Sequence, residues 1–314
     1  MATILITGGT GTIGKAISKF LMAKQHQVII LTRHLPRLSG TGTGTGNISY
    51  AAWDPAQQRI DIDALQKADY IINLAGAGVA DKRWTKKRKA ELVDSRVQSG
   101  TLLVKALQEN ANKVKAVISM SGIGWYGDDV KRGAAQPFFR EGDPADESFL
   151  GQTCVKWEEA IKPVTALNKR LVIFRCGIVL SNDGGALAEF KKPVRAGVAT
   201  FFGSGEQTTS WIHVDDLCRL YLYAIDNESI QGVYNTVAPQ PVSNKNFMLA
   251  LAKKIKGRFF IPVYIPSFVL KLILGEVSIE VLKSATVSCE KLVSSGFQFL
   301  FPTLDVALDD LIKK

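Results

Sequence analysis

The sequence predicts an α/β protein, with a doubly wound parallel sheet and a smaller, mainly helical C-terminal substrate lobe. Two observations predict the sheet: short β-branched runs alternate with helical patterns through the first half, and a glycine turn follows the first run. The chain length of 314 residues predicts the lobe, because this length suits a nucleotide-binding core that carries a second, smaller unit.

The expected strands are short apolar runs that read, in chain order, ILIT, VIIL, ISYAAW, YIINLA, VKAVISM and RLVIF. Runs that are apolar on both faces are typical of parallel strands covered by helices on each side. Helices between successive strands imply right-handed crossovers. The segment TGTGTG at 41–46 has no strand leading into it, and we interpret it as a surface loop.

The regular alternation stops after RLVIFRCGIVL. Glycine-rich connections, the string WIHVDDL and a helix from about Leu217 to Asp226 follow, and the pattern beyond Pro239 is mostly helical. We therefore assign residues 1–180 and 211–240 to a dinucleotide-binding domain, and residues 181–210 and 241–314 to the substrate lobe.

The most apolar stretch of the second half, Ile261 to Leu274, is interrupted by two prolines and Lys271. It is shorter than a bilayer-spanning helix requires. We expect it in the core of the substrate lobe.

Charge and cysteine content exclude several functional classes. The formal net charge is +10, but no basic run is interleaved with aromatics as a nucleic-acid surface would require, and the charge suits anionic small molecules instead. The stretch Lys82–Lys89, which contains Trp84, is expected to be a solvated helix start. Four separated cysteines without a C-x-x-C pair indicate neither disulfides nor a metal site. The N-terminus MATILITGG lacks a basic n-region. We expect a cytoplasmic protein with no nucleic-acid or membrane partner.

The segment ATILITGGTGTIGKAISKFLM is a strand, a glycine turn and a helix in direct succession, the context of a Rossmann-type dinucleotide site. Gly8 permits the tight turn, Gly11 lets the backbone approach the pyrophosphate, and Gly14 lets the helix pack against the strand. Backbone N–H groups around Thr12 and Ile13 are expected to point at the phosphates.

The end of the second strand indicates which dinucleotide binds. An NAD site usually has an acidic residue there, whereas this chain reads IILTRH. Thr32 offers a hydroxyl, and Arg33 offers a fixed cation that suits the 2′-phosphate of NADP. The alternative is that Arg33 is an ordinary surface arginine on a loop. Asp54, at the end of the third strand, is a candidate acceptor for the adenine amino group. Small residues after the fourth strand let the ribose lie close: Leu74, Ala75 and Gly76. The predicted cofactor is NADP(H).

Seven strings in the order TGGTGTIG, INLAG, SGIGWYGD, GIVLSNDGGAL, SWIHVDDL, GVYNTVAP and GFQF cover essentially the whole chain. In these strings the chain resembles the extended, epimerase-like branch of the short-chain dehydrogenase/reductase superfamily, and within it an atypical subgroup labelled nucleoside-diphosphate-sugar epimerase-like. The resemblance implies a substrate cleft between the two units. It also implies that Gly177 and Ile178 border the nicotinamide.

The chain departs from that family in its chemistry. Typical members carry a Tyr-x-x-x-Lys pair on one helix face, where the lysine charge favours the phenolate. None of the seven tyrosines here has a lysine four residues later. Aligning Glu158 with the family's glutamate puts Leu150 and Cys154 at the two positions, so the standard acid–base pair is absent.

Two hydroxyls remain as candidate proton donors on the loop after the fifth strand. Ser121 lies near the position of the family's active-site serine, and Tyr126 either supplies a proton or packs with Trp125 against the lobe. We expect Cys154 to be a buried apolar residue. His213 is a candidate base, but a structural role at the lobe junction is favoured.

Two functions stay open at this point. The first is an NADP(H)-dependent oxidoreductase or epimerase-like enzyme acting on an unidentified small molecule. The second is a non-catalytic protein that senses or sequesters NADP(H), which the missing Tyr and Lys favour.

Overall fold

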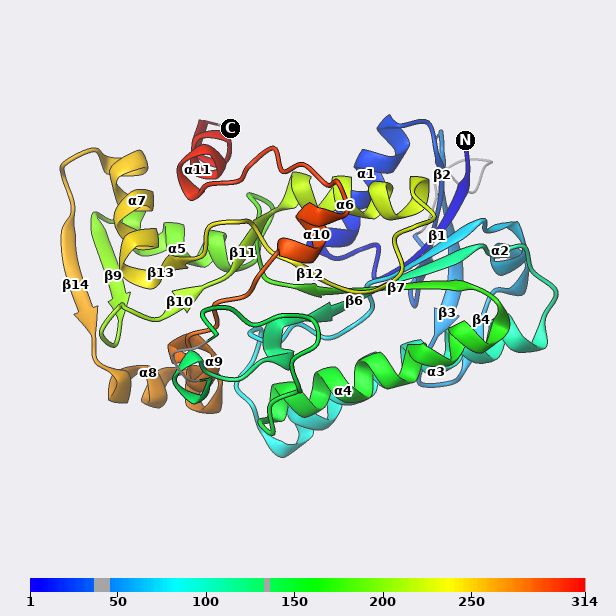
Figure 1. The fold of residues 1–314 in the computed structure, drawn as a ribbon, viewed down its shortest axis with the longest axis horizontal. Coiled ribbons are helices and arrows are strands. Elements are labelled where there is room, and N and C mark those ends of the chain that lie inside the picture. Colours follow the sequence, from blue (N-terminus) through cyan, green and yellow to red (C-terminus); the bar gives the residue numbers. More distant parts are fainter. Residues whose placement is uncertain (37–45, 133–135, 314) are drawn as a thin grey trace.

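An eight-stranded sheet forms the centre of the first unit (Figure 1). The computed structural model describes residues 1–36, 46–132 and 136–313. The strand order is β12-β7-β6-β5-β1-β2-β3-β4, and all neighbours are parallel except β3 and β4. The strands are β1 (Thr3–Thr7), β2 (Gln27–Thr32), β3 (Ile48–Asp54), β4 (Arg59–Ile60), β5 (Tyr70–Asn73), β6 (Ala116–Gly122), β7 (Arg170–Cys176) and β12 (Gly232–Thr236).

The predicted parallel sheet is confirmed, because all six predicted runs form strands of it. The short β4, which folds back on β3, was not predicted. β12 extends the sheet beyond β7 and lies in residues 211–240, which the sequence assigns to this domain. Residues 41–45 of the predicted TGTGTG loop lie outside the described residues.

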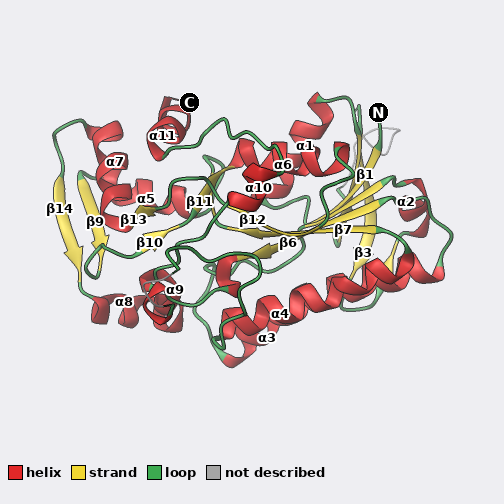
Figure 2. Ribbon diagram, in the orientation of Figure 1, coloured by secondary structure: helices red, strands yellow, loops and turns green. Residues whose placement is uncertain are grey.

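Helices cover both faces of the sheet, which explains why the strands are apolar on both sides (Figures 1 and 2). Ile4 and Ile6 of β1 pack into one core, and Leu5 between them packs into the core on the opposite face. The first face carries α1 (Thr12–Ala23), α6 (Val214–Asp226) and α10 (Glu290–Ser294). The second carries α2 (Ile62–Lys67), α3 (Lys86–Glu109) and α4 (Phe149–Ile161), with the 3-10 turns η1 (Ile123–Trp125), η2 (Asp129–Lys131) and η3 (Lys162–Leu167) in the connections.

The second unit is mainly helical, as predicted, with three small two-stranded sheets. Two of them pair β9 (Val198–Phe202) with β14 (Ile261–Ile265) and β10 (Thr208–Thr209) with β13 (Val242–Ser243). The third pairs β8 (Ile178–Leu180) with β11 (Trp211–His213) at the junction with the first unit, where Ile212 packs in the sheet core and Trp211 in the core of the second unit. Its helices are α5 (Ala186–Arg195), α7 (Asn244–Lys256), α8 (Ser267–Leu274), α9 (Ser278–Leu282) and α11 (Leu304–Lys313), with the turn η4 (Gly275–Val277). Leu187, Phe247 and Leu308 join α5, α7 and α11 in one buried core. The exact domain boundaries stay a prediction.

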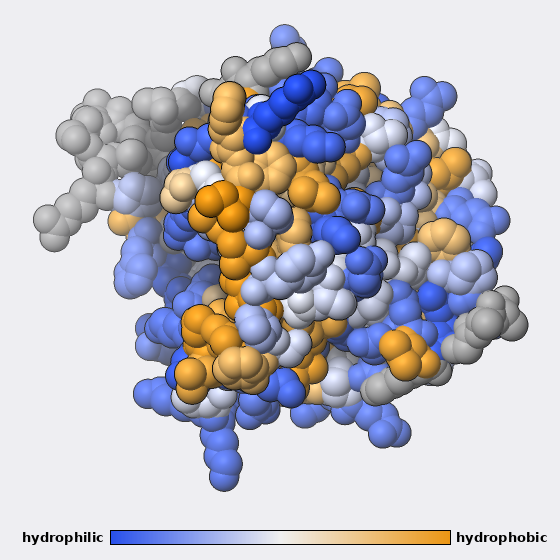
Figure 3. Space-filling model, turned by 90° about the vertical axis from the view of Figure 1, so that its left-hand side faces the viewer, coloured by the Kyte–Doolittle hydropathy of each residue, from blue (hydrophilic) through white to orange (hydrophobic). Residues whose placement is uncertain are grey.

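The expectation that Ile261–Leu274 belongs to a core is wrong. Leu270 is buried, but Ile261 is 67% exposed and Leu272 is 75% exposed. Figure 3 shows an apolar band on this side of the molecule. The reason is that α5 and α7 pack against β9 and leave its neighbour β14 uncovered. None of the helices in the described part of the chain has the length and apolar character needed to span a bilayer.

The basic stretch Lys82–Lys89 starts a helix as predicted, but it is not fully solvated. The hydroxyl of Thr85 caps α3 by accepting the N–H of Arg88. Trp84 is buried against Phe149, with ring centroids 5.0 Å apart, and the Arg88 side chain is buried and donates to the backbone oxygen of Gly78.

Candidate functional site

The glycine turn between β1 and α1 leaves no space for side chains at three of its glycines, Gly8, Gly9 and Gly14. Gly8 has a φ of +68°, and a Cβ there would lie 2.8 Å from the carbonyl carbon of Leu74. A Cβ at Gly14 would lie 2.3 Å from the Gly8 oxygen. Gly11 is the N-cap of α1, so no side chain caps the helix, and its first turn holds no acidic residue. The positive end of the α1 dipole is therefore available to an anion.

This helix end opens into a cleft of about 960 Å³ at the carboxyl ends of β1, β2, β3 and β5. Most residues predicted to bind the cofactor line it: Gly8, Gly11, Thr12, Ile13, Gly14, Thr32, Arg33, Asp54, Leu74, Ala75 and Gly76. The cleft also takes in Met120 of β6 and, on α3, Ser95 and Gln98. Its size and position suit a dinucleotide.

Gly177 and Ile178 do not line this cleft. Gly177 lies at the junction of the two units, where its N–H donates to the Thr236 oxygen and a Cβ would meet the Ser210 oxygen at 2.6 Å. Ile178 begins β8 and pairs with Trp211. Their predicted place beside the nicotinamide stays a prediction.

Two polar side chains of the cleft wall are already used by local turns. Asp54 accepts the N–H groups of Ala56 and Gln57 at 3.1 and 3.3 Å, and the Thr32 hydroxyl bonds to the backbone of His34. Arg33, by contrast, is exposed and makes no ion pair with any residue that the structure describes. Its guanidinium is therefore free to meet a phosphate at the end of β2.

A buried hydrogen-bond network that sequence reasoning missed supports the floor of the cleft. The Thr7 hydroxyl donates to Asn73 Oδ1 at 2.8 Å and accepts the N–H groups of Leu74 and Ala75 at 3.1 Å. Asn73 also bonds to Ser99 and Ser119. These bonds fix the loop after β5 against the glycine turn. The one signal for this network in the sequence is Asn73, a polar residue at the end of an apolar strand.

Ser121 and Tyr126 lie in a second buried network, away from the cleft wall. The Ser121 hydroxyl donates to Glu158 Oε1 at 2.8 Å. The two oxygens of Glu158 accept Nε and Nη2 of Arg175 at 2.8 and 2.9 Å, which makes a bidentate pair between α4 and β7. The Tyr126 hydroxyl donates to Asn235 Oδ1 at 2.6 Å and accepts Arg175 Nη1 at 3.2 Å. Arg175 therefore connects both hydroxyls.

The structure shows Tyr126 in a packing role. Its side chain is fully buried and stacks on Phe139, with ring centroids 5.1 Å apart. Burial raises the pKa of Tyr126 to about 12, against the opposing effects of Arg175 and Asn235. Proton donation by Ser121 or Tyr126 stays a prediction. It requires the hydroxyl to give up its hydrogen bond to a protein group and to form one with the substrate.

The face of α4 that would carry the Tyr-x-x-x-Lys pair is apolar. A Cβ on Gly124 would touch Leu150 and Cys154, and the Cys154 thiol donates to the Gly122 oxygen at 3.6 Å. One cation lies beside it: Arg96 of α3 is buried, with its guanidinium 4.7 Å from the Trp157 ring centroid and close to Gly76. Arg96 donates to the Leu92 oxygen and has no acidic partner among the described residues.

We expect the cysteines to react slowly in the folded protein. Burial raises the pKa of Cys154 and Cys289 to about 11, and of Cys176 and Cys218 to about 12. Burial disfavours the thiolate, so almost none is present at pH 8. A disulfide reagent such as DTNB should label the native protein at least about a hundredfold more slowly than a free thiol, and should label all four cysteines after unfolding. One fast-reacting thiol in the native state would contradict this expectation.

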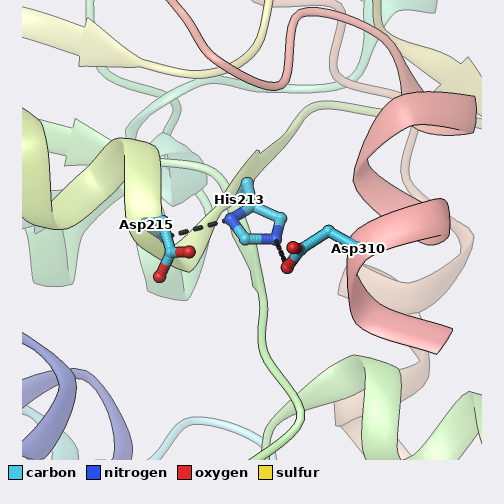
Figure 4. A group of neighbouring side chains, drawn as sticks. All are labelled: His213, Asp215 and Asp310. Carbon is cyan, nitrogen blue, oxygen red and sulfur yellow. Dashed lines mark hydrogen bonds and ion pairs between the residues drawn. The ribbon is translucent and has the colours of Figure 1, made fainter. Parts of the chain in front are cut away.

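His213 is an orienting, structural residue (Figure 4). Its Nδ1 accepts the N–H of Asp215 at 3.0 Å and so caps α6, while Nε2 lies 3.4 Å from Asp310 of α11. Its ring stacks on Phe301 at 3.8 Å between centroids. His213, Asp215 and Asp310 offer ligand atoms within 4.8 Å of one another, as a metal site would. Nδ1 is already committed to the helix cap, however, and the cluster joins the sheet unit to the last helix.

Comparison with known proteins identifies relatives of the whole chain. Residues 4–236 match the model of the NAD dependent epimerase/dehydratase family, and residues 265–311 match a domain of unknown function, DUF1731. An epimerase family protein of Staphylococcus aureus is 36% identical over 314 residues, which is all of both chains. One of Staphylococcus saprophyticus is 35% identical over 99% of this chain and 100% of its own.

Two solved structures share the fold over 99% of this chain. The human epimerase family protein SDR39U1, solved with NADPH, has a TM-score of 0.83 at 28% identity, and 99% of its chain is covered. A nucleoside-diphosphate sugar epimerase of Corynebacterium glutamicum has a TM-score of 0.75 at 27% identity, and 58% of its longer chain is covered.

Proposed function

The chain belongs to the NAD-dependent epimerase/dehydratase family, and from that membership we propose that it is an NADP(H)-binding, atypical short-chain dehydrogenase/reductase that acts on a small molecule. The observation that carries the choice of NADP(H) is Arg33, an exposed cation without an ion-pair partner among the described residues, on the cleft wall where an acidic residue would select NAD. The human relative solved with NADPH supports the same choice.

The residues of the cleft fit such a cofactor. The uncapped N-terminus of α1 suits the pyrophosphate, and Gly8 and Gly14 hold the turn tight enough for close approach. A nicotinamide dinucleotide supplies hydride transfer at its ring. The chain's own contribution is to hold the two ends of that molecule, with Arg33 at the 2′-phosphate and the wall near Met120 and Gly76 at the opposite side.

Replacing Arg33 by alanine should weaken NADPH binding about ten- to a hundredfold and leave NADH binding unchanged. A hydrogen bond to a charged group contributes about 1.5–3 kcal/mol, which corresponds to that range of affinity. Calorimetric titration of both cofactors measures it. Arg59→Ala, an exposed arginine on β4 that does not line the cleft, is the matched control. Equal affinities of the wild type for NADPH and NADH would refute the assignment.

A non-catalytic sensor of NADP(H) is the second candidate, and the networks around Arg175 favour it. Both candidate hydroxyls are committed to protein partners, and α4 offers Leu150 and Cys154 where a proton-transfer pair would stand. The buried Arg96 beside Cys154 favours the enzyme, because it is a cation near that position. Screening carbonyl compounds for oxidation of NADPH separates the two functions. Turnover that Ser121→Ala and Tyr126→Phe abolish, with unchanged NADPH affinity, supports the enzyme, and no oxidation at all supports the sensor.

A further inference from the structure

The protein exposes a set of large apolar side chains that do not line the cofactor cleft. We call it the apolar patch, and its members are each 40% to 87% exposed: Phe259, Ile261, Val263, Tyr264, Phe268, Leu272, Ile273 and Ile279. They make up more than half of the large apolar side chains that the described part of the chain exposes. Figure 3 shows this band over β14 and α8. Scattered exposed apolar residues are normal, but a gathering of this kind marks an interaction surface.

The open edge of β14 is unsuited to pairing with another strand. Ile261 donates its N–H to Gly197, and the Ile265 oxygen accepts the N–H of Gly203, so these residues turn their backbone toward β9. By the alternation of a parallel ladder, Pro262 and Tyr264 turn their backbone outward. Pro262 has no N–H to donate, and a proline at this place is a common protection of edge strands. The patch therefore suits a partner that needs no backbone ladder.

Uncompensated positive charge borders the patch. Lys256 and Arg258 precede Phe259, and Lys271 lies within α8; none of the three has an acidic partner among the described residues. The nearby acids are engaged elsewhere, because Glu276 pairs with Lys89 and Glu280 pairs with Lys283. A second copy of this face would bring like charges together, and the whole chain carries +10. An anionic surface complements the border.

We propose that the apolar patch docks on the surface of an anionic lipid bilayer. The aromatic and aliphatic side chains enter the boundary between headgroups and acyl chains, and Arg258 and Lys271 meet lipid phosphates. The docking is interfacial, and it uses residues outside the cofactor cleft. The proposal differs from the sequence-based expectation of no membrane partner, because the segment expected in a core is exposed.

The test is co-sedimentation of the full chain with vesicles. The probe is a vesicle of phosphatidylcholine in which about one lipid in three is phosphatidylglycerol, and we expect the protein to bind it. We expect weak binding to vesicles of phosphatidylcholine alone, and release of the protein from the anionic vesicles by salt. Phe268→Ser with Leu272→Ser should abolish binding. Lys271→Ser should weaken it about fivefold, since one lysine near an anionic surface contributes about that factor. Val306→Ser, an exposed apolar residue of α11 outside the patch, is the control.

Thermal unfolding shows that each variant is folded, and the outcomes separate clearly. Failure of the wild type to sediment with anionic vesicles, or unchanged binding of the double variant, overturns the proposal. A dimer in sedimentation velocity that the double variant dissociates, without vesicle binding, assigns the patch to a second copy of this chain and also overturns it. Titration with NADPH does not depend on vesicle binding or on dimer formation. It therefore shows a failure of the proposed function separately from a failure of this proposal.

Discussion

Replacing Glu158 by alanine is expected to lower the free energy of unfolding by about 3–5 kcal/mol, the usual cost of removing one partner of a buried ion pair. Glu158 is the acidic partner of Arg175, whose side chain is 3% exposed. Burial alone lowers the pKa of the Arg175 guanidinium, but its bonds and charge interaction with Glu158 raise it above the usual value. Without Glu158 the cation would stay buried with only the Tyr126 hydroxyl and the Glu141 oxygen as acceptors.

Urea denaturation measures this loss, and the chain offers a matched control. Glu159 is the next residue on α4 and is exposed, so Glu159→Ala should change stability by less than about 0.5 kcal/mol. Glu158→Gln combined with Arg175→Met removes both charges and should recover part of the loss, because a buried pair can be exchanged for uncharged groups at small cost. If Glu158→Ala unfolds at the same urea concentration as wild type, the pair has no structural importance.

The sequence was sufficient for features that are encoded locally. A strand covered on both faces is a short apolar run, and the glycine turn is one continuous string, so β1, β2 and α1 were predictable from adjacent residues. The cleft residues followed, because the carboxyl ends of parallel strands meet at one edge of the sheet.

The networks depend on residues distant in the chain, and no local pattern reveals them. Ser121 meets Glu158, 37 positions away, and Tyr126 meets Asn235, 109 positions away. Ser121, the candidate donor to substrate, is held by one of these networks, and its neighbour Met120 lines the cleft. The apolar patch was misassigned for a related reason. Apolar composition predicts burial, but burial of Ile261 requires an element packed on a face of β14, and in the described chain α5 and α7 pack against β9 instead.

Replacing Gly14 by alanine should weaken NADPH binding by at least about a hundredfold and also destabilise the fold. The new Cβ would lie 2.3 Å from the Gly8 oxygen and 2.5 Å from the Gly9 Cα, and both are backbone atoms that no side-chain rotation can move. The start of α1 must therefore shift away from β1. We expect a loss of about 1–3 kcal/mol from overpacking, reduced by up to about 1 kcal/mol because alanine favours helix.

Alanine variants of two further glycines distinguish a loss of fold stability from a loss of NADPH binding. A Cβ at Gly11 meets only the Gly8 oxygen at 3.4 Å, so Gly11→Ala should keep the stability of the free protein and still hinder the pyrophosphate. A Cβ at Gly142 meets nothing within 4 Å, and Gly142→Ala should change neither quantity. Thermal unfolding of the three variants measures their stability, and calorimetric titration with NADPH measures their affinity for the cofactor. The displaced helix N-terminus would misalign two or more charge-assisted bonds, each contributing about 1.5–3 kcal/mol, which accounts for the hundredfold effect. If Gly14→Ala lowers stability but binds NADPH like wild type, the phosphates do not lie at the start of α1, and the cofactor site proposed for the glycine turn must be abandoned.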